Sequence, residues 1–303
     1  MEQTHINSLN LKHFWNLLLS YKWFIIIVTA TSALLSVLYA VSLPDIYKSK
    51  ALVQHVRQSE NDFSASNQFG QLASMAGLSL SGSQATDNKS VDIATIQSSD
   101  FLSQFISKNN VMIPLFAAES WAFDSNKLVY SPEVYDELND VWVRPAKAPF
   151  KPEPSIQEAV DKFREIFFID VDRISGLVNM SVDFVSPELA QAWLSVLLEQ
   201  FNEYVRAREI DIYDKNLAYL TKRVTDINSQ EIRNVLFSLI EQEQKKAMLA
   251  NVSKDYVFRI IDSPVAPLKK DSPKRALICA TGTTSGFIIA ILLVLFRQLL
   301  RDE

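Results

Sequence analysis

The sequence predicts an α+β membrane protein in which two transmembrane helices flank one large domain with long projecting helices. Three observations favour this fold class. Two uncharged apolar runs, Trp23 to Leu43 and Ala276 to Phe296, stand near opposite ends of the 303-residue chain. Short segments rich in branched residues, typical of strands, lie between them. The stretch from Glu188 to Ser263 contains neither glycine nor proline and can therefore sustain very long helices.

Each apolar run is long enough to be a membrane anchor, because about 20 apolar residues in a helix cover roughly 30 Å of hydrocarbon. For the first run the alternative is a cleaved secretory signal. A signal has an apolar core of about 7 to 15 residues and ends at a small-residue cleavage site. The first run instead continues without a charge to Leu43, so we expect two spans.

Basic residues predict the orientation of these spans. Lys12 and Lys22 precede the first span. Arg297 and Arg301 follow the second, which places both termini in the cytoplasm. Four further basic residues just before the second span favour the opposite orientation; they are Lys269, Lys270, Lys274 and Arg275. Because the first helix usually sets topology and long loops cross regardless of charge, we expect the middle of the chain outside.

The chain therefore divides into five parts. They are a cytoplasmic tail with an interfacial helix at 1–22, transmembrane helix 1 at 23–43, an outer domain at 44–275, transmembrane helix 2 at 276–296 and a second cytoplasmic tail at 297–303. For the first tail, disorder is the alternative. The only cysteine, Cys279, lies in the second span, so no disulfide forms within one chain. The outer domain is mildly acidic, which argues against a nucleic-acid partner.

The outer domain is expected to contain strands before its long helices. In chain order we predict a strand at 46–57, a long loop at 64–90, a helix at 91–109, an extended proline-containing segment at 141–154, a helix at 156–164 and strands at 166–171 and 177–185. A turn through Ser175 and Gly176 joins the last two strands.

The long helix has a marked start, with Ser186 as its cap and Pro187 at its first position. Forty residues in a helix extend about 60 Å, so this helix should project from the sheet. A second helical set follows a break near 226–229, and a strand at 256–261 returns to the sheet. One chain does not bury so long an apolar stripe, so we expect neighbours of the same kind. The candidate oligomer face consists of Trp193, Leu197, Phe201, Tyr204 and Leu220.

Small residues and prolines mark the second span. Gly282 and Gly286 form a GxxxG pair, a face on which another helix can approach closely, and Ser32 and Ser36 offer a similar face on the first span. The alternative is that these small residues have no partner. Three prolines precede the span and predict a semi-rigid extended strut; they are Pro264, Pro267 and Pro273.

The sequence offers no catalytic constellation. Its six glycines cannot form a phosphate loop of the GxxxxGK[ST] type or a dinucleotide GxGxxG motif. Its three histidines lack metal-ligand spacing, and paired carboxylates such as Glu241 and Glu243 lie on a charged helical segment. We therefore predict no catalytic residue, no metal site and no cofactor.

Several segments together resemble the Wzz-type polysaccharide co-polymerases, the chain-length determinant proteins. They are LPDIYKSKALV at 43–53, LASMAGL at 72–78, VDFVSPELA at 182–190, FRIIDSPVAP at 258–267 and SPKRAL at 272–277. The resemblance covers nearly the whole chain, and it depends on the order and spacing of the segments.

This resemblance implies a protein of the bacterial inner membrane whose periplasmic domain has an α/β base. It implies a homo-oligomeric ring that sets the length distribution of O-antigen or a related glycan made by a Wzy-type polymerase. Membrane lipid and the nascent lipid-linked glycan are further implied partners. Such proteins are not themselves glycosyltransferases.

Two other functions stay open. Some relatives carry a tyrosine autokinase after the second span, but the seven residues after Phe296 contain no such domain. An adaptor for capsule or exopolysaccharide export that works with a separate tyrosine kinase is therefore one alternative. A two-span membrane receptor is the other, although its two tails offer no globular output domain.

Overall fold

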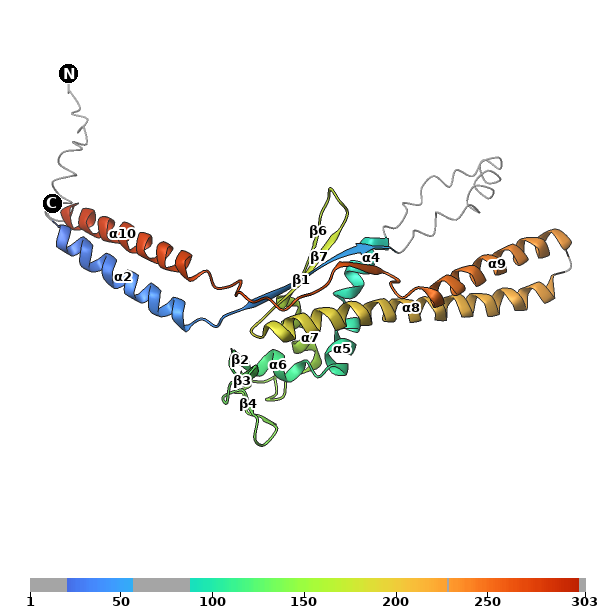
Figure 1. Cartoon of the computed structure of the whole chain (residues 1–303), viewed down its shortest axis with the longest axis horizontal. Helices are drawn as coiled ribbons and strands as arrows, with labels where there is room; N and C mark the ends of the chain where they lie inside the picture. The colour runs from blue at the N-terminus through green and yellow to red at the C-terminus, as the bar shows by residue number, and fades with distance from the viewer. Residues whose placement is uncertain (1–20, 57–87, 228, 300–303) are drawn as a thin grey trace, which may run out of the picture. The chain divides into compact units, whose positions relative to one another are not determined.

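The computed structural model describes residues 21–56, 88–227 and 229–299. The chain forms two units (Figure 1). One unit contains the chain up to Ile46 and from Lys270 onward, and the other contains Tyr47–Lys269. The expected interfacial helix and most of the expected loop at 64–90 lie outside the described residues.

The first unit contains the two apolar helices, α2 (Lys22–Ser42) and α10 (Arg275–Leu299), which lie side by side. Both are long and apolar enough to cross a membrane. Most of their side chains are exposed, among them Leu34, Leu38 and Ile288. Water would disfavour this much exposed apolar surface, whereas lipid tails solvate it.

The second unit is built on an antiparallel sheet with the order β6-β7-β1-β8. Its strands are β1 (Tyr47–His55), β6 (Phe167–Val171), β7 (Val178–Phe184) and β8 (Phe258–Asp262). Alternation along β7 directs four side chains into the core: Val178, Met180, Val182 and Phe184. Gly176, at a φ of +72°, makes the predicted turn between β6 and β7.

Helices cover one face of this sheet. They are α4 (Asn88–Ile96), α5 (Ser99–Lys108), α6 (Met112–Ala117), α7 (Ile156–Ile166) and the first part of α8. The single helix expected at 91–109 is two helices. Ser98 separates them, because its side chain accepts a hydrogen bond from the Phe101 amide and begins a new helix.

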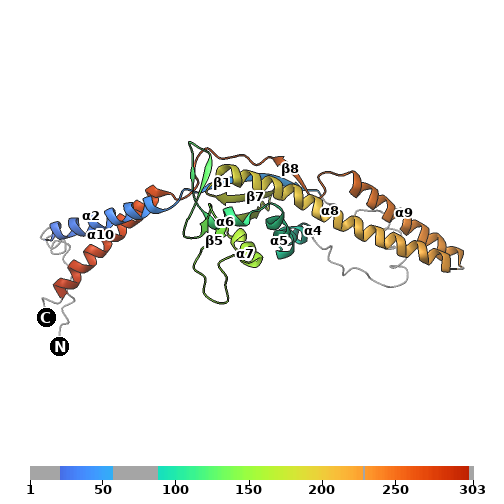
Figure 2. The same ribbon diagram turned by 90° about the horizontal axis from the view of Figure 1, so that it is seen from below.

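The helix α8 (Pro187–Asp226) has 40 residues and pairs with α9 (Gln230–Val252), which runs back beside it. The Ser186 side chain caps α8 by accepting from the Leu189 amide, as the sequence predicts. In both views the far end of the α8–α9 hairpin extends away from the sheet (Figures 1 and 2). The α+β fold with two flanking apolar helices and long projecting helices is confirmed.

Two small hairpins occupy a region for which the sequence patterns predict no element. The first joins β2 (Ala118–Ala122) to β3 (Lys127–Tyr130). The second joins β4 (Tyr135–Asp136) to β5 (Val141–Trp142), so the expected extended segment begins as a strand. These strands are too short for alternation to reveal them.

A buried asparagine ties the returning strand to the long helix. Asn202 in α8 is 7% exposed. Its Oδ1 accepts hydrogen bonds from the amides of Val257 and Phe258 at 2.9 and 2.8 Å, and its Nδ2 donates to the Phe258 carbonyl at 2.8 Å. The side chain thereby acts as a strand partner for the start of β8. An apolar residue at this position would leave these backbone groups unsatisfied.

We expect Asn202→Ala to lower the free energy of unfolding by about 3 kcal/mol, because each buried group left without a partner costs roughly 1 to 3 kcal/mol. Chemical denaturation of the full chain in detergent, followed by circular dichroism, measures the change. Asn216→Ala is the control, since Asn216 lies exposed on the same helix. Equal effects of the two substitutions would contradict this role for Asn202.

Candidate functional site

The contact between the two spans depends on small residues. A methyl group added to Gly282 would overlap the side chain of Ser36, and one added to Gly286 would overlap that of Ser32. The Ser32 hydroxyl also donates to the Gly282 carbonyl at 2.9 Å. The structure thus brings together, within one chain, the two small faces that the sequence suggests separately. Backbones can approach this closely only where side chains are absent or short.

A cluster of charges joins the ends of the spans. Arg275 donates from Nε to the Ala40 carbonyl at 3.0 Å and from a terminal nitrogen to the Leu43 carbonyl at 3.3 Å. It also lies 3.0 Å from the Asp45 carboxylate, which Lys270 contacts at 2.9 Å. The last carbonyls of a helix have no partner within it, and a cation there is favourable. Arg275 therefore caps α2 from the first residue of α10.

The predicted proline strut is held at separate points. Pro264 is buried, and its carbonyl accepts from Gln191 in α8 at 3.0 Å. The neighbouring Val265 carbonyl accepts from Ser49 in β1 at 3.0 Å. Pro267 lines a cavity described below. Pro273 belongs to the other unit, where the chain beside it pairs through Ile46 and Ser272. No helix forms between Ser263 and Lys274, in keeping with the prolines.

The candidate oligomer face lies largely inside this chain. Trp193, Leu197 and Phe201 are at most 5% exposed and pack in the chain's own core. Tyr204 packs against the same core and donates to Asp100 at 2.6 Å, and Leu220 is half-buried. The helical periodicity of this face is therefore explained by the sheet and helices that it covers. The buried residues are not accessible to a second chain.

Other apolar side chains of the α8–α9 hairpin are exposed. Ile232, Val235 and Leu239 recur at the spacing of one face of α9 and are between 38% and 52% exposed. The hairpin also exposes Ile212, Tyr219, Phe237, Met248, Leu249 and Val252. Exposed apolar side chains that recur on one helix face are typical of a contact with another molecule.

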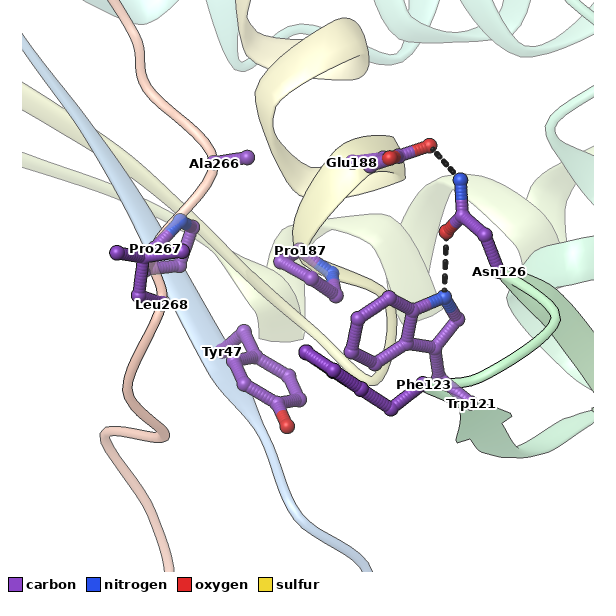
Figure 3. Close-up of a pocket in the computed structure, with 9 residues that line it drawn as sticks. All are labelled: Tyr47, Trp121, Phe123, Asn126, Pro187, Glu188, Ala266, Pro267 and Leu268. Carbon is purple, nitrogen blue, oxygen red and sulfur yellow. Dashed lines mark hydrogen bonds between the residues drawn. The ribbon is translucent and has the colours of Figure 1, made fainter.

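A cavity of about 280 Å³ forms where four distant segments meet (Figure 3). Tyr47 comes from β1, Pro187 and Glu188 begin α8, and Ala266, Pro267 and Leu268 belong to the chain that follows β8. The β2–β3 hairpin supplies Trp121, Phe123 and Asn126. The sequence patterns single out none of these residues for binding; they place Pro267 in the strut and Pro187 at the start of the long helix.

Several ionisable groups have pKa values that are shifted by structural contacts. Hydrogen bonds from the Ser155 amide and from Arg144 lower the pKa of Glu158, which closes the capping box of α7. A hydrogen bond to Asp100 raises the pKa of Tyr204, and burial raises that of Tyr213. Among the residues that the structure describes, no three His, Cys, Asp or Glu side chains group as metal ligands.

A second buried polar contact links β1 to α4. His55 Nε2 lies 2.9 Å from the Asp92 carboxylate, and Asp92 is 1% exposed. The His55 ring also packs edge-on against Phe258 at a centroid distance of 5.7 Å. The pair holds α4 against the sheet. Because Asp92 is buried and the His55 ring packs on Phe258, we interpret the pair as a structural contact.

Comparisons with known proteins identify two family models along the chain. The model for Wzz, the chain length determinant protein, matches residues 7–109. The model for GNVR, a G-rich domain described on tyrosine kinases, matches residues 226–299. A comparison with curated protein sequences finds no match.

Solved structures of co-polymerases are similar to this chain. A full-length bacterial polysaccharide co-polymerase is 12% identical at a TM-score of 0.38, over 95% of this chain and 97% of the other. A fragment of the co-polymerase WzzB from Salmonella Typhimurium is 16% identical at a TM-score of 0.28, over 76% of this chain and 100% of the other. The chain thus carries a Wzz chain length determinant domain at 7–109 and a GNVR domain at 226–299, which confirms its resemblance to the Wzz-type polysaccharide co-polymerases.

Proposed function

We propose that this chain sets the length distribution of lipopolysaccharide O-antigen as a non-catalytic, oligomeric scaffold for a Wzy-type polymerase. The observation that carries the proposal is the Wzz match, which spans α2, β1 and α4–α5. The Wzz and GNVR domains support a chain-length co-polymerase for a polysaccharide.

We further propose that the chain lies in the bacterial inner membrane, with 1–22 and 297–303 in the cytoplasm and 44–275 in the periplasm. The apolar lengths of α2 and α10 support two spans. Basic residues near the termini support the orientation, because positively charged segments are retained on the cytoplasmic side. The exposed apolar side chains of the spans would then contact lipid.

The proposed scaffold is a homo-oligomeric ring. The exposed face of α9 at Ile232, Val235 and Leu239 supports it, because a second copy would cover this face. In such an assembly the ring would limit how long the polymerase stays engaged with the growing, lipid-linked glycan. Chain length would follow from the geometry of the assembly, and no catalytic group would be required. The sequence supports this because it contains no phosphate loop or dinucleotide motif.

A second candidate function is an adaptor for capsule or exopolysaccharide export with a separate tyrosine kinase. The GNVR match favours it, because that domain is described on tyrosine kinases. The polysaccharide affected in the cell distinguishes the two functions.

Deletion of the gene should collapse a modal cluster of lipopolysaccharide bands into a short, random ladder on a gel, and the intact chain should restore the cluster. The reason is that the polymerase would lose the scaffold that limits its engagement. An unchanged ladder together with altered capsule or exopolysaccharide would favour the second candidate. A change in neither would contradict both.

Replacing both Gly282 and Gly286 with leucine should shift the modal glycan length, because each leucine would force the spans apart at Ser36 and Ser32. The matched control is Thr281→Leu with Ser285→Leu, since these exposed positions precede the glycines by one residue on the same helix. The band distribution on the gel is the readout. If both double variants give the same glycan length, packing between the spans does not set that length.

A cysteine at Val235 should crosslink neighbouring chains in native membranes, because Val235 belongs to the exposed apolar face of α9. The background carries Cys279→Ser, which removes the only natural thiol. Gln244→Cys is the control, since nine residues place it on the opposite side of the helix. Equal crosslinking at both positions, seen as dimers on a denaturing gel, would argue against this face.

A further inference from the structure

The cavity between β1, the β2–β3 hairpin, α8 and the 266–268 segment has an apolar side and a polar side. We propose that it binds one neutral pyranose ring of the polysaccharide. This inference rests on the proposed function, because it names the part of the glycan that this chain would hold. Its lining residues come from four parts of the sequence and converge on one cavity (Figure 3).

Three aromatic rings form the apolar side. Trp121 packs edge-on against Tyr47 at a centroid distance of 5.6 Å and against Phe123 at 5.4 Å. The Phe123 side chain is 75% exposed, so the fold itself gains little from its apolar surface. The C–H face of a pyranose ring is apolar and flat enough to stack on such rings. Aromatic side chains supply large contact areas of this kind.

A hydrogen-bonded pair forms the polar side. The Trp121 indole nitrogen donates to Asn126 Oδ1 at 2.9 Å, and Asn126 Nδ2 donates to Glu188 Oε2 at 2.6 Å. Asn126 has a φ of +50°, a conformation that asparagine tolerates well in a turn. This chain of bonds orients the Glu188 carboxylate beside the rings. A carboxylate has acceptor sites beyond the one that Asn126 uses, and sugar hydroxyls are donors.

Charge and size restrict the ligand. The nine described residues that line the cavity include one carboxylate and no Lys or Arg. An acidic sugar would therefore face Glu188 without a cation to offset the repulsion, which favours a neutral ring. The volume of about 280 Å³ lies just below the usual range for pockets that hold a whole small ligand. It suits a single ring of a longer polymer, with the remainder in solvent.

A direct binding measurement tests this inference. The full chain in nanodiscs is titrated with the polysaccharide whose length responds to the gene, released from its lipid by mild acid, and binding is followed by saturation-transfer NMR. We expect Trp121→Ala to weaken binding about tenfold, equivalent to about 1.4 kcal/mol. Trp121→Phe, which keeps a ring and protects the fold, should weaken binding less. Phe150→Ala is the control, because Phe150 is an exposed aromatic residue outside the cavity.

Charge provides a second test. Oligogalacturonate, an acidic polymer, should bind the unaltered chain more weakly than dextran of matched length, and Glu188→Gln should reduce that difference. Unchanged affinity of Trp121→Ala for the released polysaccharide would overturn the inference. A loss of crosslinking between chains in this variant, with polysaccharide affinity retained, would instead assign the cavity to a second copy.

The two proposals fail separately. If the unaltered chain restores the modal length but binds no polysaccharide, the cavity inference is wrong and the proposed function stands. If the unaltered chain does not restore the modal length, the proposed function is wrong.

Discussion

The two apolar spans impose the constraint on which the rest of the structure depends. Hydrocarbon offers no hydrogen-bond partner for an open backbone, so each span must be a helix. Because one span lies near each end of the chain, the domain between them must begin and end at the membrane. The sheet shows this return directly, because β1, which follows α2, pairs with β8, which precedes α10. Within the other unit, Ile46 and Ser272 pair in the same antiparallel sense.

Polar side chains contact the backbone of the returning chain at several points. Asn202 binds the start of β8, and Gln191 and Ser49 bind the chain after it. A segment rich in proline lacks amide donors and forms few regular backbone bonds. Side chains from α8 and β1 supply partners instead, and these contacts fix the path of the irregular connection.

The two parts of α8 pack against different elements. Its first part covers the sheet with Trp193, Leu197 and Phe201, and this burial accounts for the apolar periodicity that predicts an intermolecular face. Its second part contacts α9 only along one side, and exposed apolar residues remain on the hairpin. Periodicity identifies a face that must be covered, but it does not distinguish a sheet of the same chain from a second chain.

The sequence by itself determined the features that depend on neighbouring residues. Apolar length predicts both spans, Ser186 with Pro187 predicts the start of α8, and Gly176 predicts the turn between β6 and β7. Only the tertiary structure decided which distant segments meet. It placed Gly282 against Ser36, joined Asn202 to Phe258 and assembled the aromatic cavity from four segments. These contacts depend on the path of the whole chain, and local propensity and periodicity carry no information about that path.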